Sequence, residues 1–355
     1  MSRVNAAGLT GLTCPIPIGD YPRVLLAHGG GGRLTHMLIH NLFARAFANP
    51  ALSPLHDGAV LEVKGGRLAV TTDSFVVTPR FFPGGDIGSL AVHGTVNDLA
   101  MCGASPLALT AGFVIEEGLE MDELWHIVQS MQGAAAAAGV AIVTGDTKVV
   151  DRGKGDGLFI NTTGIGRVAD GVEISPRRAC PGDAVLINGP IAQHGIAIRS
   201  VREGLEFETT LESDSAALHG LVADLLGAAG PAVHVLRDPT RGGVSSALNE
   251  IAEAARVGIR LDEASIPIAE EVRGACEILG LDPLYVANEG KVLAIVARES
   301  AEAALAAMRA HPLGHGAALI GEVVDDHPGR VFMRSLVGGM RVVDMLSGEQ
   351  LPRIC

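Results

Sequence analysis

A run of four glycines is the first segment whose residue types suggest chemistry. Residues 27–33 read Ala-His-Gly-Gly-Gly-Gly-Arg and stand directly before a segment with helical periodicity, 34–47. Glycines let the backbone pass close to a ligand, and unpaired N–H groups at a helix start favour an anion. We therefore predict that Gly30, Gly31 and Gly32 contact phosphate groups. A flexible loop is the alternative, because the run matches neither the P-loop nor the dinucleotide pattern.

Three aspartates form the second group of candidates. Asp73 and Asp146 each come at the end of an apolar, strand-like run, and Asp98 follows Asn97 in a helical segment. Carboxylate oxygens in such places suit Mg²⁺ held against substrate phosphates. For any one of these aspartates alone, a turn or cap role is the simpler explanation. The three together, beside a glycine run, favour a magnesium site, with Asn97 and Thr147 as further polar contacts.

Two further motifs carry side chains that can move protons or neutralise charge. Glu289 lies in Ala-Asn-Glu-Gly-Lys at 287–291, between two predicted strands, where a hairpin turn is the alternative. Lys291 is able to pair with Glu289, which would leave both residues structural. Asp238 and Arg241, in the motif at 237–243, either line a cleft or cap the next helix.

The chain ends on a cysteine, Cys355. A thiol on the last residue of a tail is expected to be exposed, and it can carry a small group into a pocket. The five cysteines are scattered and never in Cys-x-x-Cys spacing, so the sequence predicts neither a disulfide framework nor a zinc site. Cys102 and Cys276 stand in apolar helical contexts and are expected to be buried.

The composition is that of a globular protein, and it excludes several classes of function. The chain is 48% hydrophobic and has a formal net charge of −13. This acidic balance argues against nucleic-acid binding and against docking on anionic lipid. No apolar stretch reaches the length of a membrane span, and residues 1–17 lack the apolar core of a signal peptide. We expect a cytoplasmic protein.

Strands and helices alternate in a mixed order, and they must bring these motifs together. Hairpins mixed with helices favour an α+β arrangement over a doubly wound sheet. Two prolines, a glycine and charges at 175–183 indicate a domain boundary, and the glycines after residue 335 indicate a flexible tail, so the predicted units are 1–174, 175–335 and 336–355. The main predicted strands are 59–63, 67–72, 107–115, 140–144, 159–168, 184–188, 233–236, 259–261, 292–297, 318–324 and 330–333, and the main predicted helices are 87–101, 123–138, 192–203, 215–226, 244–255, 269–279 and 301–310.

Taken together, these motifs resemble the HypE family of hydrogenase maturation proteins. That family lies in a superfamily with aminoimidazole ribonucleotide synthetase, formylglycinamidine synthetase, thiamine-monophosphate kinase and selenophosphate synthetase. The resemblance covers nearly the whole chain, and the ending PRIC separates HypE from the other members. The segments that carry it are HGGGGRLTHMLI, TTDSFVVTP, HGTVNDLAMCGASPLAL, TGDTKVV, DPTRGGV, ANEGK and the terminal PRIC.

The resemblance implies a two-domain α/β fold like that of aminoimidazole ribonucleotide synthetase. ATP would lie in the cleft between the domains, and the N-terminal domains would pair in a homodimer. The implied enzyme is an ATP-dependent dehydratase that works on its own C-terminus. The carbamoyltransferase HypF would load a carbamoyl group onto Cys355, which is then converted to a thiocyanate. The cyano group would pass to the HypC–HypD scaffold, for the iron of a nickel–iron hydrogenase.

Each candidate residue takes a role on this basis. Cys355 is the acceptor thiol, Lys148 neutralises charge on the transferred phosphoryl group, and Glu289 is the base that takes the amide protons. Arg353 guides the tail toward phosphate or acidic groups. The residues expected to contact ATP are Gly30, Gly31, Gly32, Asp73, Asn97, Asp98, Asp146 and Thr147, and the three aspartates among them also hold Mg²⁺.

Other functions fit the same residues. A synthetase or kinase of this superfamily, acting with ATP on a free metabolite, would keep its chemistry without Cys355. A non-catalytic carrier of the terminal thiol would hydrolyse no ATP. A metal-carrier role is disfavoured, because the tail offers the thiol no histidine or second cysteine.

Overall fold

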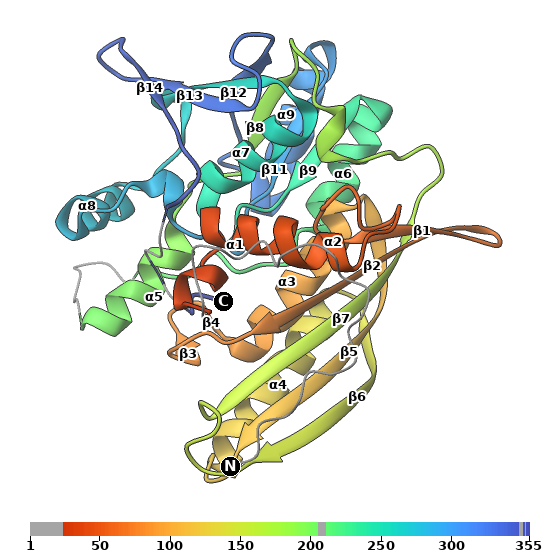
Figure 1. Ribbon diagram of the computed structural model, residues 1–355, viewed down its shortest axis with the longest axis vertical. Coiled ribbons are helices and arrows are strands. Elements are labelled where there is room, and N and C mark those ends of the chain that lie inside the picture. Colours follow the sequence, from red (N-terminus) through yellow and green to blue (C-terminus); the bar gives the residue numbers. More distant parts are fainter. Residues whose placement is uncertain (1–23, 205–210, 348–350, 352) are drawn as a thin grey trace, which may run out of the picture.

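The computed structural model describes residues 24–204, 211–347, 351 and 353–355. It has two domains, each built on one large mixed sheet, and Figure 1 shows them stacked along the long axis. The N-terminal sheet has the order β1-β2-β7-β5-β6, and the C-terminal sheet has the order β14-β13-β10-β12-β8-β11-β9. The strands are β1 Ala59–Val63, β2 Gly66–Phe75, β3 Phe81–Phe82, β4 Gly85–Asp86, β5 Ala104–Glu116, β6 Ala141–Val150, β7 Leu158–Val168, β8 Ala184–Ile187, β9 Val233–Arg237, β10 Gly258–Asp262, β11 Leu293–Val296, β12 Ala318–Val324, β13 Arg330–Arg334 and β14 Met340–Val342.

Helices cover these sheets, and some of them begin or end at a residue suited to the place. The carboxylate of Asp86 accepts the N–H groups of Gly88 and Ser89 and caps the start of the long α3 helix. Gly280, with φ +66°, ends α8 in the left-handed conformation that glycine adopts without strain. The helices are α1 Arg33–Leu38, the π-helix η2 Ile39–Phe43, α2 Ala44–Ala46, α3 Ile87–Met101, α4 Met121–Ala137, α5 Gln193–Glu203, α6 His219–Ala229, α7 Gly243–Ala255, α8 Glu270–Leu279 and α9 Ala301–Ala310.

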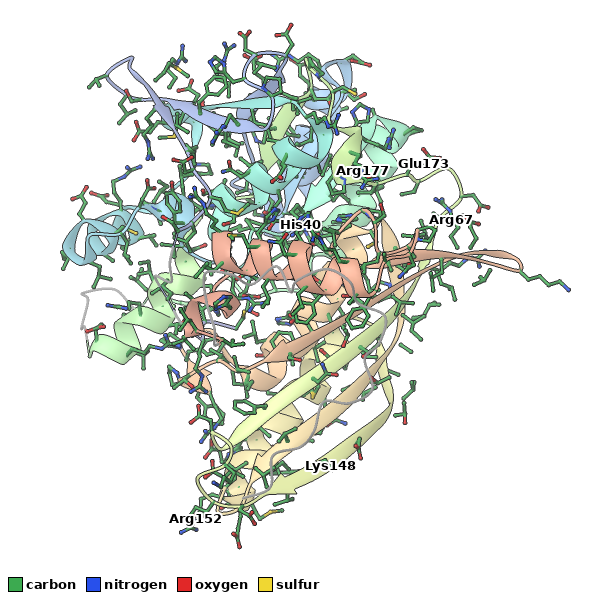
Figure 2. The ribbon with its side chains drawn as sticks, viewed as in Figure 1. His40, Arg67, Lys148, Arg152, Glu173 and Arg177 are labelled. Atoms are coloured by element: carbon green, nitrogen blue, oxygen red, sulfur yellow. The ribbon has the colours of Figure 1, made fainter. Side chains whose placement is uncertain are left out.

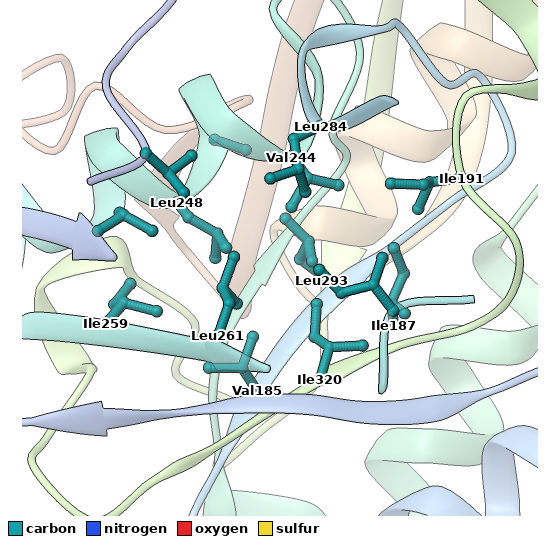
Figure 3. Packing of buried hydrophobic residues seen from close by; sticks show 14 of the residues in the cluster. Val185, Ile187, Ile191, Val244, Leu248, Ile259, Leu261, Leu284, Leu293 and Ile320 are labelled. Atoms are coloured by element: carbon teal, nitrogen blue, oxygen red, sulfur yellow. The ribbon is translucent and has the colours of Figure 1, made fainter. Parts of the chain in front are cut away.

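The central strands of the C-terminal sheet, β8 and β11, are apolar throughout and buried on both faces. Alternate side chains enter two different cores, because successive residues of a strand point to opposite faces. Val185 and Ile187 pack with side chains of α7 in the cluster of Figure 3, whereas Leu186 packs with α6 and α9. Burying each such side chain stabilises the fold by about 1.5–3 kcal/mol. This core fixes the position of Asp238, which follows β9, and of Glu289, which precedes β11.

The predicted two-domain α+β architecture is confirmed. The predicted hairpin is β1–β2, and the predicted helix 87–101 is α3 with the same bounds. Two predictions are wrong. Strand β6 continues to Val150, so Asp146 lies within a strand and not after one. Residues 287–291 follow a short 3-10 helix (η6, Pro283–Tyr285) and precede β11, so they form no hairpin turn.

The end of the chain is buried, although the sequence suggested an exposed thiol on a free tail. Strand β14 pairs with β13 and joins residues 340–342 to the C-terminal sheet. The chain then returns to the region between the domains, where Figure 1 marks its end. There Cys355 is only 8% exposed and Ile354 only 1%. The apolar side chain and the thiol lose contact with water, and the main chain finds hydrogen-bond partners, so burial is favoured.

The remaining expectations concern the boundary, the other cysteines and the membrane. The boundary predicted near residue 175 falls in the linker between β7 and β8. Cys102 and Cys276 are buried as predicted, and Cys14 lies outside the described residues. Within the described part of the chain, no helix has both the length and the apolar character needed to span a membrane.

Candidate functional site

Three aspartates from distant parts of the chain meet between the two domains. Asp57 lies in the loop before β1, Asp98 lies on α3, and Asp238 follows β9 directly. Each offers a carboxylate oxygen, and these oxygens lie within 4.8 Å of one another. We call these three residues the aspartate cluster. It combines one side chain from a loop, one from a helix and one from a strand end, so only the folded chain assembles it.

The aspartate cluster carries more negative charge than its neighbours neutralise. Arg237 Nη1 lies 2.7 Å from Asp57 Oδ1, and Thr71 donates a hydrogen bond of 2.7 Å to Asp98 Oδ2. Burial raises the pKa of Asp57 to about 6 and that of Asp238 to about 8. Burial and the charge of Asp238 raise the pKa of Asp98 well above its ordinary value. Asp57 Oδ2 is buried with no hydrogen-bond partner among the described residues. Three carboxylate groups so close together are suitable ligands for a divalent cation such as Mg²⁺.

Of the predicted magnesium ligands, Asp98 belongs to the aspartate cluster and Asp73 lies near it, but Asp146 does not. The charge of Asp73 contributes to the raised pKa of Asp98. Asp146 stands on β6, three strand spacings from β2, or about 14 Å. It shares its sheet face with Asn161 and Ser74, whereas Asp73 is the next residue along β2 and points to the opposite face. Within one chain, therefore, the predicted set of three ligands is wrong.

Lys148 and Thr147 share this exposed strand with Asp146. Lys148 Nζ donates to both carboxylate oxygens of Asp146, at 2.8 and 2.6 Å, and this interaction lowers the pKa of Asp146. The two side chains are 67% and 70% exposed. Figure 2 shows Lys148 at the outer edge of the N-terminal sheet, far from His40 on the helix beside the C-terminal domain. The predicted phosphoryl-neutralising lysine therefore does not reach the aspartate cluster of its own chain.

Glu289 is buried beside the aspartate cluster, and it is not neutralised by Lys291. Lys291 instead pairs with Asp214 at 3.0 Å, and Asp214 accepts the backbone N–H of Glu289 at 3.1 Å. Glu289 is 3% exposed, and its Oε1 has no hydrogen-bond partner in the described part of the chain. Burial, followed by the charge of Asp238, raises the pKa of Glu289 well above its ordinary value. The alternative in which Lys291 and Glu289 form a structural pair is excluded.

Asn97 holds the segment around Glu289 in place. Its amide group donates to the carbonyl of Ala216 at 3.0 Å and to that of Glu289 at 3.3 Å. Its Oδ1 accepts the N–H of Leu218 at 2.8 Å. An asparagine inside a helix usually has such local reasons. The predicted contact between Asn97 and a nucleotide is not supported, because these bonds within the protein engage the side chain.

The buried thiol of Cys355 lies within electrostatic range of Arg241, Glu289, Asp73 and Asp238. Burial raises the pKa of its thiol; Arg241 opposes that change, and Glu289 and Asp73 add to it. The thiol therefore shares two acidic neighbours, Asp73 and Asp238, with Glu289. Sequence reasoning named Cys355 and Glu289 separately, and the fold brings them together.

The glycine run packs against Arg241 and against the segment that leads to the tail. Gly31 has φ +73°, and a Cβ there would lie 2.6 Å from the Cβ of Arg241. A Cβ on Gly32 would collide with the carbonyl oxygen of Leu346. The N–H of Gly31 donates to Thr35 Oγ1 at 3.0 Å, so this state does not offer it to a phosphate. Close packing explains these glycines, and phosphate contact by the run stays a prediction.

A cavity of about 540 Å³ opens between the helix after the glycine run and α7. Its walls come from both domains, and they combine apolar side chains with three guanidinium groups and the carboxylates of Glu250 and Glu253. Arg237, which contacts Asp57, lines the cavity, so the cavity adjoins the aspartate cluster. The apolar part of this lining suits a flat base, and Arg177 and Arg256 offer guanidinium groups for anionic groups of a ligand. The lining includes Gly31, His36, Ile39, Leu55, Arg177, Arg237 and Arg256.

Local sequence patterns did not identify three residues that the structure places at the site: Asp57, Asp214 and His194. Asp57 stands in His-Asp-Gly and Asp214 in Ser-Asp-Ser, and both contexts are typical of turns and caps. His194 is wholly buried on α5, where a lone histidine looks like an ordinary core residue. No local spacing could have singled them out, because their partners are distant in sequence.

Comparisons with known proteins agree along nearly the whole chain. The family models "AIR synthase related protein, N-terminal domain" and "AIR synthase related protein, C-terminal domain" match residues 55–168 and 180–334. A carbamoyl dehydratase HypE of Rhizobium leguminosarum bv. viciae is 57% identical over 333 residues, covering 94% of this chain and 95% of the relative. The carbamoyl dehydratase HypE of Escherichia coli strain K12 is 48% identical over 337 residues, covering 94% of this chain and 99% of the relative.

Solved structures give the same result. A HypE–HypF complex contains a chain with a TM-score of 0.83 and 50% identity, covering 87% of this chain and 99% of that chain. A HypE structure in complex with ATP has a TM-score of 0.79 and 52% identity, covering 94% and 100% of the two chains. The thiamine monophosphate kinase of Aquifex aeolicus, at 17% identity and a TM-score of 0.64 with 85% of this chain and 97% of that chain covered, shares the fold alone.

Proposed function

Because the chain belongs to the HypE family of carbamoyl dehydratases, we propose that it converts an S-carbamoyl group on its own Cys355 to a thiocyanate, using ATP. The product supplies the cyanide ligand of a nickel–iron hydrogenase. The observation that carries the proposal is the position of Cys355, which is buried between the domains, where His194 binds the preceding carbonyl and the charges of Glu289 and Asp238 act on the thiol. A terminal thiol in this place is a tethered substrate, and the site surrounds the group it carries.

ATP makes the amide oxygen able to leave. Removal of water from a thiocarbamate breaks its carbon–oxygen bond, and hydroxide is a poor leaving group, whereas phosphate is a good one. The cavity between the domains has room for a nucleotide beside the aspartate cluster. The oxygens of Asp57, Asp98 and Asp238 would hold Mg²⁺, and Asp57 Oδ2, which accepts no hydrogen bond in the described part of the chain, supports that assignment. When bound, Mg²⁺ neutralises charge on the phosphate oxygens.

Glu289 is the base of the proposed reaction. A nitrogen proton must leave as the carbon–nitrogen triple bond forms, and Glu289 Oε1 has no competing hydrogen-bond partner among the described residues. A buried carboxyl with a raised pKa becomes a stronger base once it is ionised. The same burial excludes water, which would otherwise hydrolyse the activated carbon.

The buried position of Cys355 does not suit the first step, in which the thiol attacks a carbamoyl donor. A raised pKa keeps the thiol protonated, and a thiol is a far weaker nucleophile than a thiolate. The tail therefore receives its carbamoyl group away from this site, on a HypF carbamoyltransferase, and returns with it. The solved HypE–HypF complex of a relative supports this partner. A HypC–HypD scaffold then accepts the cyano group.

A homodimer completes the proposed site. Leu61, Val114 and Ile165, from three strands of the N-terminal sheet, are each at least 37% exposed on the face that also carries Lys148. Strand β6 at the edge of this sheet is exposed along nearly its whole length, which is unusual for a long edge strand. A second copy packed on this face covers these apolar groups and brings Lys148 to the nucleotide of its partner.

The test is mass spectrometry of the C-terminal peptide after incubation with the carbamoylating partner and ATP. We expect a carbamoyl adduct on Cys355 that loses the mass of one water only when ATP is present. An adduct that never loses water contradicts the proposal. ATP consumption that is unchanged in Cys355→Ala favours a metabolite-directed synthetase, and no ATP consumption by the loaded wild-type chain favours a carrier.

A further inference from the structure

The last three residues are held mainly through their main chain. The N–H of Val76 donates to the terminal carbonyl oxygen of Cys355 at 3.0 Å, and the N–H of Thr78 donates to the carbonyl of Arg353 at 3.3 Å. Arg353 Nε donates back to the carbonyl of Val76 at 3.1 Å. The segment after β2 thus holds the tail by two main-chain hydrogen bonds and by the guanidinium group of Arg353, which folds back onto Val76. The residues after β2 therefore form one wall of a groove.

The other wall of the groove contacts the opposite side of the same three residues. His194 Nε2 lies 2.8 Å from the carbonyl of Ile354, and its Nδ1 lies 2.7 Å from Ser213 Oγ. A carbonyl oxygen only accepts, so Nε2 carries the proton and Nδ1 accepts from the serine hydroxyl. Arg202 donates to the carbonyl of Arg353 as well. We call the groove formed by the main chain of 76–78 and by His194 and Arg202 the tail groove.

Side chains of the tail add one apolar and one charged contact. Ile354 is 1% exposed and belongs to the same buried cluster as Ile198 and Ala287. Arg353 forms an ion pair with Asp156 at the mouth of the groove, which agrees with its predicted attraction to acidic groups. A partly exposed ion pair contributes little, so the buried isoleucine is the main element of side-chain specificity.

None of these contacts depends on how residue 353 is joined to the rest of the chain. We infer that the tail groove binds a separate peptide with a free C-terminus of the form basic–apolar–cysteine, and that the site dehydrates an S-carbamoyl group on such a peptide in trans. This inference rests on the proposed function. It predicts that the protein dehydrates a diffusible peptide. The protein's own tail competes with that peptide for the groove, at an effective concentration of about a millimolar.

The step balances without any further reactant. The peptide thiocarbamate and ATP give the peptide thiocyanate, ADP, phosphate and one proton. The carbonyl carbon–oxygen bond breaks and the oxygen leaves on phosphate. Both nitrogen protons leave: one ends on the departing phosphate as hydrogen phosphate, and Glu289 accepts the other as the triple bond forms and later releases it to solvent as the one free proton. Nothing is oxidised or reduced, so the chemistry is the same as that proposed for Cys355.

The experiment uses the full chain with Ile354→Glu. A carboxylate cannot enter the apolar end of the groove without a large loss of hydration, so the variant's own tail is displaced. We expect dehydration of its own loaded Cys355 to fall about tenfold or more. We also expect an added synthetic peptide, Leu-Pro-Arg-Ile-Cys carrying an S-carbamoyl group, to lose one water with ATP. The same peptide with glutamate in place of isoleucine should stay unchanged.

Val337→Glu is the matched control, because Val337 is 95% exposed in the turn between β13 and β14. This variant should dehydrate the S-carbamoyl group on its own Cys355 as fast as the wild type. It should dehydrate the peptide slowly, because its own tail still occupies the groove. Ile354→Ala displaces the tail without introducing a charge, and it serves if Ile354→Glu fails to fold. Fluorescence anisotropy of a labelled, uncarbamoylated peptide measures binding independently of the reaction.

The outcomes separate the two proposals. If the wild-type chain never dehydrates its own loaded cysteine, the proposed function fails. If the wild-type chain does so, but the folded Ile354 variants neither bind nor dehydrate the peptide, the inference about the tail groove is overturned. Binding of the peptide without loss of water overturns the activity in trans as well.

Discussion

Asp98 and Asp146 look alike in sequence, since each stands in a glycine-containing motif beside an apolar run, yet the fold gives them opposite environments. Asp98 lies in the aspartate cluster, where burial raises its pKa well above the ordinary value. Asp146 lies on the exposed edge strand β6, where Lys148 lowers its pKa. Asp98 meets the carboxylates of Asp57 and Asp238 from distant parts of the chain, whereas Asp146 pairs with Lys148, two residues away. A motif therefore indicates the chemistry of a side chain but not which other side chains it meets in the fold.

The largest effect is expected at Glu289, within the region that one chain completes. Glu289→Gln keeps the shape of the side chain and removes the base, so thiocyanate formation should fall about 10²–10⁴-fold. Carbamoylation of Cys355 should continue, and mass spectrometry of the C-terminal peptide measures both steps. Glu271→Gln on the exposed part of α8 is the control and should behave like the wild type. Normal dehydration by Glu289→Gln would remove Glu289 from the mechanism.

A second effect is expected at Asp98. Asp98→Asn should lower the magnesium-dependent rate of ATP hydrolysis by the loaded chain about 10–100-fold, because it removes one ligand oxygen charge. The resistance to unfolding without metal should stay the same or increase, since a poorly compensated buried charge is lost. ATP hydrolysis over a magnesium titration and thermal unfolding measure the two quantities. The exposed Asp170→Asn is the control. A large loss of stability with unchanged magnesium dependence would make Asp98 structural.

The third effect tests whether Lys148 serves the partner chain. Lys148→Ala and Glu289→Ala should each be nearly inactive as homodimers. In a mixed dimer, one site combines the intact Glu289 of one chain with the intact Lys148 of the other, so random mixing should restore about a quarter of the wild-type activity. Dehydration rates of the two variants, alone and after co-refolding, measure this. No recovery on mixing, with mixed dimers present, would mean that Lys148 does not act across the interface.

The smallest effect concerns stability and pH. Burial lowers the pKa of His93 from 6.5 to about 4, so between these values the unfolded chain binds a proton at His93 that the folded chain does not. Stability should therefore fall as the pH falls through this range, by about 2 kcal/mol from pH 7 to pH 5 for this residue. His93→Gln should lose correspondingly less stability over the same interval in urea unfolding. An unchanged pH dependence would show that His93 is protonated in the folded chain.

Much of the secondary structure could be predicted from local patterns. The helix 87–101 and the β1–β2 hairpin follow from apolar periodicity and from the glycine turn between the strands. The exposure of β6 and the register of its pairing could not be predicted, because both depend on strands that are far away in sequence. For the same reason, the sequence could not predict which residue pairs with Lys291. Asp214 lies 77 positions before it, and only the folded chain brings the two together.

The sequence by itself determined which chemistry is present: a terminal thiol, a carboxylate at Glu289, several aspartates and a glycine run, in motifs that identify the family. The tertiary structure alone decided which of these groups meet. It joined Asp57 and Asp238 to Asp98, separated Asp146 from them, and folded Cys355 back onto Glu289. The physical reason is that side-chain identity is a local property. Burial, electrostatic neighbours and hydrogen-bond partners arise from contacts between segments that the chain order leaves far apart.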